Sequence, residues 1–92
     1  MRLLRISPST DKDKKWMAVF EDPQKTTHFG ARGYEDYTQH RNELRKESYL
    51  ARHRTRENWN DPTSAGALSR WILWNKPTLT ASIEDFKKRF SL

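Results

Sequence analysis

Four arginines recur at helical spacing in the middle of this sequence, and their side-chain chemistry suits phosphate. Their separations of four, seven and four residues follow a repeat of about 3.6 residues per turn, so one helix would carry them within one arc. These four residues, called here the arginine stripe, are Arg41, Arg45, Arg52 and Arg56. A guanidinium can donate two hydrogen bonds to one anion, and Tyr49, at the edge of the arc, could stack on an unpaired base. The spacing predicts a nucleic-acid-binding face about 22 Å long.

Two other interpretations of the arginine stripe stay open. It could be an ordinary solvated helix face, or it could dock onto an acidic protein surface. Glu43 and Glu47 lie on a different side of the same predicted helix, where they could pair with Lys46 or Arg54 without touching the stripe. This segregation of acids from arginines favours contact with nucleic acid.

Three residues outside the stripe are further candidates for nucleic-acid contact. Trp59 lies in a polar loop, where it could pin the loop onto the core or stack on a base or a partner's ring. Lys87 and Lys88 add positive charge near the C-terminus of the last predicted helix. Cations are stabilising at that end of a helix in any case, so their charge has a structural explanation as well.

Catalytic chemistry finds little support in the pattern of titratable residues. His28, Asp36 and His40 could meet near a hairpin-to-helix junction, as in a small metal nuclease. However, no two histidines stand four residues apart, and the sequence has no His-Glu-x-x-His motif. Three glycines also leave no room for a glycine-rich phosphate loop or a nucleophile elbow. We therefore expect a protein that is not an enzyme and that uses no metal or cofactor.

Composition sets the limits within which these residues must be positioned. The chain has 92 residues, so we expect one domain spanning 1–92. The net charge of +6 favours a polyanionic partner, of which nucleic acid is the commonest. The absence of cysteine excludes disulfides and thiol catalysis. No apolar run approaches the roughly 20 residues that span a bilayer, so we expect no membrane partner.

The first third of the chain is typical of strands. We predict strands over 2–7, 16–22 and 26–30, joined as an antiparallel meander that fills 1–33. Gly30 and Gly33 then allow the backbone to reverse into the helical part, 34–92. The predicted fold class is α+β, with a three-stranded meander followed by three helices.

The three predicted helices differ in how much of their surface is apolar. The first, 38–57, carries the arginine stripe and only a thin apolar stripe, which marks it as peripheral. That apolar stripe consists of Tyr37, His40, Leu44, Ser48 and Ala51. The second helix runs to about Asn75 after a cap at Thr63 or Ser64, and the third follows a cap at Thr78. Their apolar residues, with Trp16, Trp71 and Trp74, are expected to form most of the core. The alternative for the segment that holds Trp71 and Trp74 is an exposed docking patch.

The segment from Phe29 to Phe90 resembles a family of short uncharacterised proteins encoded by large DNA viruses of algae and protists. The shared pattern includes "FG", "DYT", "AGALSRWILW" and "KKRF" and covers about two thirds of the chain. The resemblance points to the phycodnavirus and mimivirus groups of giant viruses and brings no established reaction. It implies a viral protein that acts in the host nucleus, in a cytoplasmic viral factory or in the virion.

Two functional hypotheses follow from the residues and the resemblance together. The first is a small basic protein that binds nucleic acid, DNA in preference to RNA, in genome packaging or maintenance. The second is a minor virion or assembly protein that joins other virion proteins through aromatic and arginine contacts. The sequence favours the first hypothesis.

Overall fold

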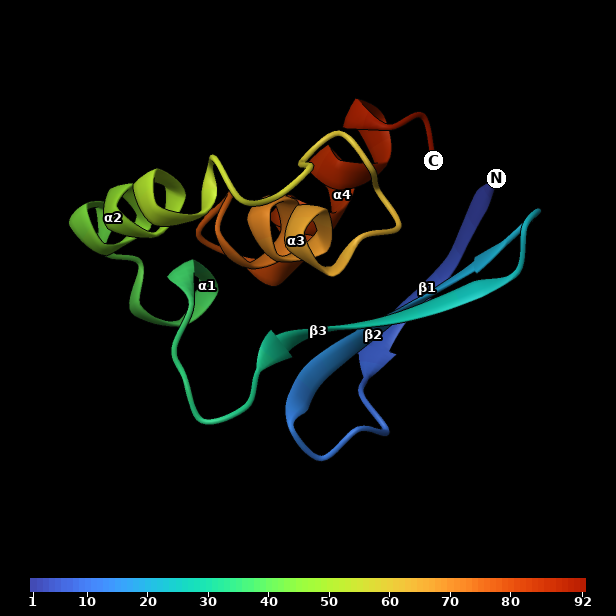
Figure 1. Ribbon diagram of the computed structural model, residues 1–92, viewed down its shortest axis with the longest axis horizontal. Helices are drawn as coiled ribbons and strands as arrows, with labels where there is room; N and C mark the ends of the chain where they lie inside the picture. Colours follow the sequence, from blue (N-terminus) through green and yellow to red (C-terminus); the bar gives the residue numbers. More distant parts are fainter.

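Three antiparallel strands form the first part of the fold, as the sequence predicts. The computed structural model describes residues 1–92, and its strands are β1 (Arg2–Pro8), β2 (Lys14–Glu21) and β3 (Lys25–Ala31). They form one sheet in the order β1-β2-β3, which is the predicted meander. Helices follow the sheet in the chain and cover one of its faces (Figure 1). The α+β fold class is therefore confirmed.

The core lies between this covered face and the helices. Side chains alternate between the two faces of a strand, so Ala18 and Phe20 of β2 point to the same side, and Phe29 of β3 joins them. Seven residues form the buried cluster: Ala18, Phe20, Phe29, Leu68, Ile72, Leu73 and Phe86. The sheet and the C-terminal helices thus close the core together.

The tryptophans surround the core and do not occupy its centre. Trp16, Trp71 and Trp74 are half-buried and pack against the cluster, whereas Ile72 and Leu73 between the last two are fully or almost fully buried. The predicted core role of these rings is met in part, because each keeps an exposed edge.

The helix predicted over 38–57 is wrong as a single helix. The chain forms α1 (Tyr37–His40), turns at Arg41 in the left-handed conformation (φ 54°), and starts again as α2 (Glu43–His53). Asn42 causes the restart, because its side chain accepts a hydrogen bond from the backbone N–H of Arg45 as an N-cap. The helix also ends four residues earlier than predicted, at His53.

Two further caps confirm the predicted starts of the C-terminal helices. Ser64 caps α3 (Ala65–Leu68), and Thr78 caps α4 (Leu79–Arg89). Between them, Ser69–Leu73 widens into a π-helical turn, in which the N–H of Trp74 donates to the carbonyl of Ser69 at 3.0 Å. The split of the first predicted helix is why the chain has four α-helices and not three. None of its helices combines the length and apolar character that a membrane crossing requires.

Candidate nucleic-acid interface

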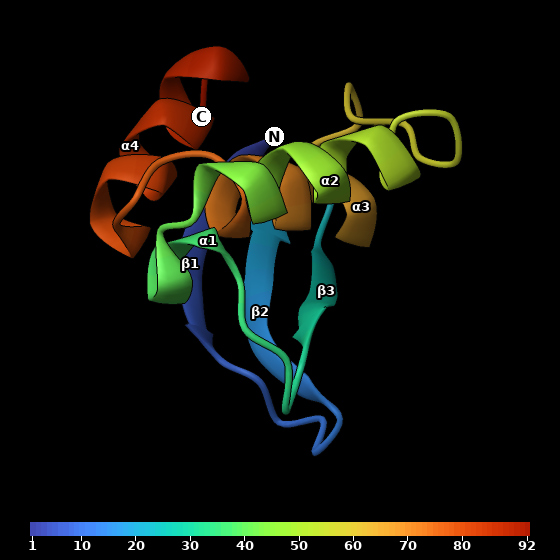
Figure 2. The ribbon, with the colours of Figure 1, turned by 90° about the vertical axis from the view of Figure 1, so that its left-hand side faces the viewer.

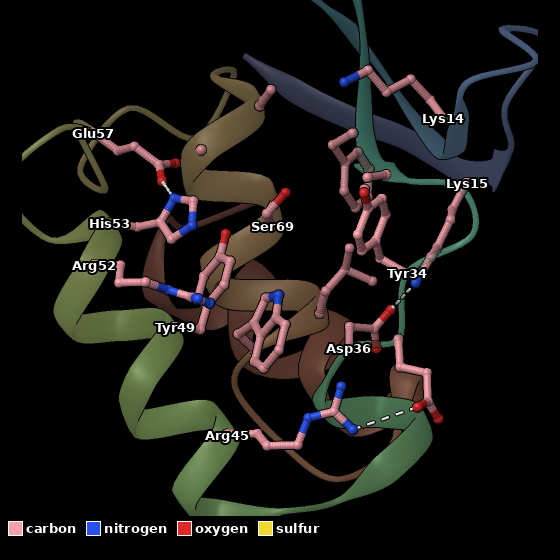
Figure 3. A pocket seen from close by; sticks show the side chains of 18 of the residues that line it. Lys14, Lys15, Tyr34, Asp36, Arg45, Tyr49, Arg52, His53, Glu57 and Ser69 are labelled. Carbon is pink, nitrogen blue, oxygen red and sulfur yellow. Dashed lines mark hydrogen bonds and ion pairs between the residues drawn. The ribbon is translucent and has the colours of Figure 1, made fainter.

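A groove lies beside α2 and brings together residues that are far apart in the sequence. Its volume is about 830 Å³, and it is called here the α2 groove. One wall is α2 with the turn that follows it, and the other is formed by the adjoining ends of β2 and β3 and the loop before α1 (Figure 3). Helix α3 and the π-helical turn that follows it form the base of the groove. Figure 2 shows α1 and α2 on the side of the molecule that faces the viewer.

Stacked aromatic rings form part of the base of the α2 groove. The ring of Tyr49 stacks on Trp74 with centroids 4.2 Å apart and planes 4° apart. It also stacks on His53, four residues further along α2, at 4.1 Å and 21°. Two rings cannot occupy the same face, so both faces of Tyr49 are covered. Tyr49, which the sequence offered for stacking on a base, is thus already engaged within the protein.

The inward face of α2 also differs from the predicted apolar stripe. Lys46, Tyr49, Leu50 and His53 face the rest of the protein, whereas Leu44 is 75% exposed. The prediction failed because it continued one helical register through the break at Arg41. Burial, with Glu57 nearby, raises the pKa of Tyr49 to about 12, which is consistent with a phenol held inside the protein.

Two of the five lysine and arginine side chains that line the α2 groove pair with acids of the groove itself. The five residues are Lys14, Lys15, Arg45, Arg52 and Arg56. Lys15 pairs with the buried carboxylate of Asp36 at 2.8 Å, and Arg45 pairs with Glu35 at 3.4 Å. A hydrogen bond also joins the His53 ring to Glu57.

The other three cations have no acidic partner. Lys14, Arg52 and Arg56 form no ion pair in the structure. Their side chains also donate no hydrogen bond to the rest of the protein. They approach the groove from both of its walls, Lys14 from β2 and the arginines from α2 and the turn after it. The groove therefore offers unneutralised positive charge on two sides.

Arg41 does not belong to this surface, contrary to the predicted stripe. It lies in the turn between α1 and α2, and its Nε donates to the carbonyl of Pro77 at 3.0 Å. The left-handed backbone at Arg41 breaks the helical register that would have aligned it with the other arginines. Arg45, Arg52 and Arg56 do line the same groove, although Arg56 lies beyond the end of α2.

Trp59 holds its loop against Arg70 and Trp71 and is not among the residues that pack against the core cluster. The first of the two predicted alternatives, a loop pinned onto the core, is therefore met only in part. The carbonyl of Trp59 accepts a hydrogen bond from Trp71 Nε1 at 2.9 Å. The guanidinium of Arg70 lies 5.4 Å from the Trp59 ring and 4.1 Å from the Trp71 ring, and that of Arg89 lies 3.7 Å from the Trp71 ring. These four residues form an alternating set that is called here the tryptophan–arginine ladder.

Lys87 and Lys88 lie apart from the α2 groove. Both are exposed in the last turn of α4 and neither lines the groove. Figure 1 shows α2 and α4 at opposite ends of the helical layer. The structure therefore does not bring Lys87 and Lys88 together with the arginines of the α2 groove.

The histidines are held by neighbours on separate elements. His28 shares a hydrogen bond with Ser9 Oγ at 2.7 Å, and Nδ1 of His40 accepts from the N–H of Asn42 at 2.9 Å. The structure contains no group of three His, Cys, Asp or Glu side chains placed to hold a metal ion.

Sequence reasoning missed three residues of the α2 groove that lie outside helices. Lys14 and Lys15 start β2, and Tyr34 lies in the loop before α1. A signal was present for the lysines, since a meander pairs the start of its second strand with the end of its third, and Lys14 is indeed opposite Ala31. No local pattern, however, places that sheet corner beside α2.

The comparison with protein families gives one match, and it covers more than half of the chain. The model of a family of unknown function, DUF5754, matches residues 4–53. These residues include β2, β3, α1 and α2, and thus both walls of the α2 groove except for the turn that holds Arg56. No curated protein and no solved structure matches the chain. The chain therefore belongs to the family of unknown function DUF5754.

Proposed function

We propose that this protein binds nucleic acid through the α2 groove and catalyses no reaction. The observation that carries the proposal is the presence of three cations without acidic partners on the two walls of one groove. They are Lys14, Arg52 and Arg56. A phosphate backbone supplies evenly spaced negative charge, so it can satisfy cations that approach from two sides.

The chemistry of the two arginines supports phosphate as their target. A planar guanidinium can donate two hydrogen bonds to one phosphate, and both Arg52 and Arg56 are exposed. The net charge of +6 would also attract a nucleic acid from a distance at low salt. Neither the arginines nor the net charge requires a chemical step. Nδ1 of His53 is hydrogen-bonded to Glu57, and no hydrogen bond joins this histidine to a serine of the groove, as a serine nucleophile would require.

The biological role is proposed from the viral resemblance. A large DNA genome in a confined particle requires basic proteins that neutralise phosphate, and we place the protein in genome packaging or maintenance. DNA is the preferred partner, in the host nucleus or a viral factory. The competing role as a virion or assembly protein has less support, because Tyr49 and Trp59, which would make its contacts, pack against other side chains of the chain.

The experiment compares two charge reversals by fluorescence anisotropy with labelled DNA and RNA. The double variant Arg52→Glu with Arg56→Glu removes the unpaired arginines of the α2 groove. The matched control, Lys87→Glu with Lys88→Glu, makes the same change in net charge on exposed residues of α4. We expect the first to weaken binding at least about tenfold at 50 mM salt and the control to change it less than about threefold.

Either of two results would contradict the proposal. One is an equal loss of affinity in both double variants, which would mean that net charge alone attracts the nucleic acid. The other is the absence of measurable binding by the unaltered protein at low salt. Circular dichroism of both variants would show that their folds are intact, which is expected because all four side chains are exposed.

A further inference from the structure

Tyr34 is the most exposed aromatic residue of the α2 groove and has no established role in the fold. It is 74% exposed, and it lies in the loop between β3 and α1. Figure 3 shows its ring on the wall of the groove that faces Tyr49 and Arg52. Tyrosine is enriched at interfaces, because its ring combines an apolar body with a polar hydroxyl.

The ring of Tyr34 is free, whereas the ring of Tyr49 is not. No other aromatic ring and no cation lies over Tyr34 in the structure. Tyr49 has a ring stacked on each face. Of the two tyrosines that line the groove, only Tyr34 can accept a further ring.

The backbone that carries Tyr34 is held at both ends. Its own N–H donates to the carbonyl of Ala31 at 3.4 Å. Two residues later, Asp36 is 3% exposed, pairs with Lys15 and caps α1 through the N–H of Thr38 at 3.0 Å. The backbone at Tyr34 is therefore held beside the groove, which reduces the entropy lost when the residue binds a partner.

A free ring and unpaired cations on facing walls match the two parts of a nucleotide. A base is a flat ring that stacks on an aromatic side chain, and the attached phosphate suits arginine. In a duplex each base is already stacked between its neighbours, so a ring at the side of a groove reaches only an unpaired base. We propose that Tyr34 stacks on an unpaired base of a single-stranded nucleic acid whose phosphates contact Arg52 and Arg56.

This inference rests on the proposed function and makes it more specific. Aspartate and glutamate side chains would also satisfy the arginines, but they have no flat ring to place on Tyr34. The structure therefore favours a single strand over both duplex and acidic protein, and each of these becomes an outcome of the test.

The experiment uses labelled oligothymidine, an abasic strand of equal length, a hairpin duplex and a polyglutamate competitor. The abasic strand keeps the phosphates and lacks the bases, so it separates the two contacts. In Tyr34→Leu we expect affinity for oligothymidine to fall about 5- to 150-fold, the range expected for loss of one base stacked on an aromatic ring. Affinity for the abasic strand should not change. Tyr34→Phe keeps the ring and should bind as the unaltered protein does.

The outcomes separate the inference from the function on which it rests. If Tyr34→Leu binds oligothymidine as tightly as the unaltered protein while Arg52→Glu with Arg56→Glu does not, the stacking role is wrong and the nucleic-acid function stands. Equal affinity of the unaltered protein for the oligothymidine and abasic strands, or tighter binding of the duplex, also overturns the stacking role. Efficient competition by polyglutamate that is unaffected by Tyr34→Leu points to an acidic protein partner and overturns both.

Discussion

Two regions of this protein use the same kinds of side chain for opposite purposes. In the tryptophan–arginine ladder, the guanidinium of Arg70 lies over the rings of Trp59 and Trp71, and that of Arg89 also lies over the ring of Trp71. In the α2 groove, Tyr49 stacks on Trp74 and His53, and Arg52 and Arg56 have neither a ring nor an acid as partner.

The ladder uses its arginines to hold the fold. Arg70 Nη1 donates to the carbonyl of Trp74 at 2.9 Å, and Arg89 pairs with Asp85 at 3.3 Å. Burial, with the charge of Arg89 nearby, lowers the pKa of Arg70, as expected for a guanidinium removed from water. These arginines cannot serve a ligand without giving up contacts within the protein. Counting the arginines in a sequence is therefore a poor guide to an interface. The better guide is the number of arginines that have no partner within the folded protein.

The largest effect on stability should come from the ladder. Arg70→Met keeps most of the side-chain length but removes the cation–π contacts with two tryptophans and the hydrogen bond to Trp74. We expect the free energy of unfolding to fall by about 2 kcal/mol or more. The matched change in the groove, Arg52→Met, should alter it by less than about 0.5 kcal/mol. Urea unfolding measures both, and equal losses would remove the distinction between the two regions.

A smaller effect should come from the wall of the α2 groove at Gly30. Its φ is 81°, and a Cβ at this position would lie 2.8 Å from Leu73 Cδ1 in the core. Gly33 has a φ of 91° but open space around it, so Gly33→Ala adds only the backbone strain. We expect Gly30→Ala to lower the free energy of unfolding by about 1 kcal/mol more than Gly33→Ala does. If thermal unfolding shows the two variants to be equally stable, the wall is not closely packed.

A third effect concerns the base of the groove and appears only at alkaline pH. The pKa of Tyr49 is raised to about 12 in the folded protein, against about 10 for an unfolded tyrosine. The unfolded chain therefore loses this proton first, and the contribution of Tyr49 to stability, fully present below pH 10, should be lost between about pH 10 and 12. Tyr49→Phe should flatten that part of the curve of unfolding free energy against pH. An unchanged curve would mean that the Tyr49 hydroxyl is not buried.

The sequence predicts the elements that depend on local patterns. The three strands were located by their apolar residues and turns, and Ser64 and Thr78 marked helix starts because their hydroxyls can accept an N-terminal backbone hydrogen bond. The break at Arg41 was missed although Asn42 is a good N-cap. The stretch around it contains neither glycine nor proline, and the arginine spacing favoured one long helix.

The candidate site was less predictable because tertiary packing assembles it. Arg45, Arg52 and Arg56 were found from their spacing, and the structure brings all three into the α2 groove. Whether Tyr49 or Tyr34 has the free ring depends on the position of Trp74, which comes from a distant part of the chain. No periodicity within either segment carries that information.

The most direct test of the central claim is the salt dependence of single-strand binding between about 50 and 200 mM. The logarithm of the binding constant should fall linearly with the logarithm of salt concentration, by about 0.7 for each phosphate contacted. The variant Arg52→Gln with Arg56→Gln should reduce this slope by about 1.4, because two phosphate contacts are lost. A slope that is the same in the variant and the unaltered protein would contradict the claim that these arginines hold the phosphates.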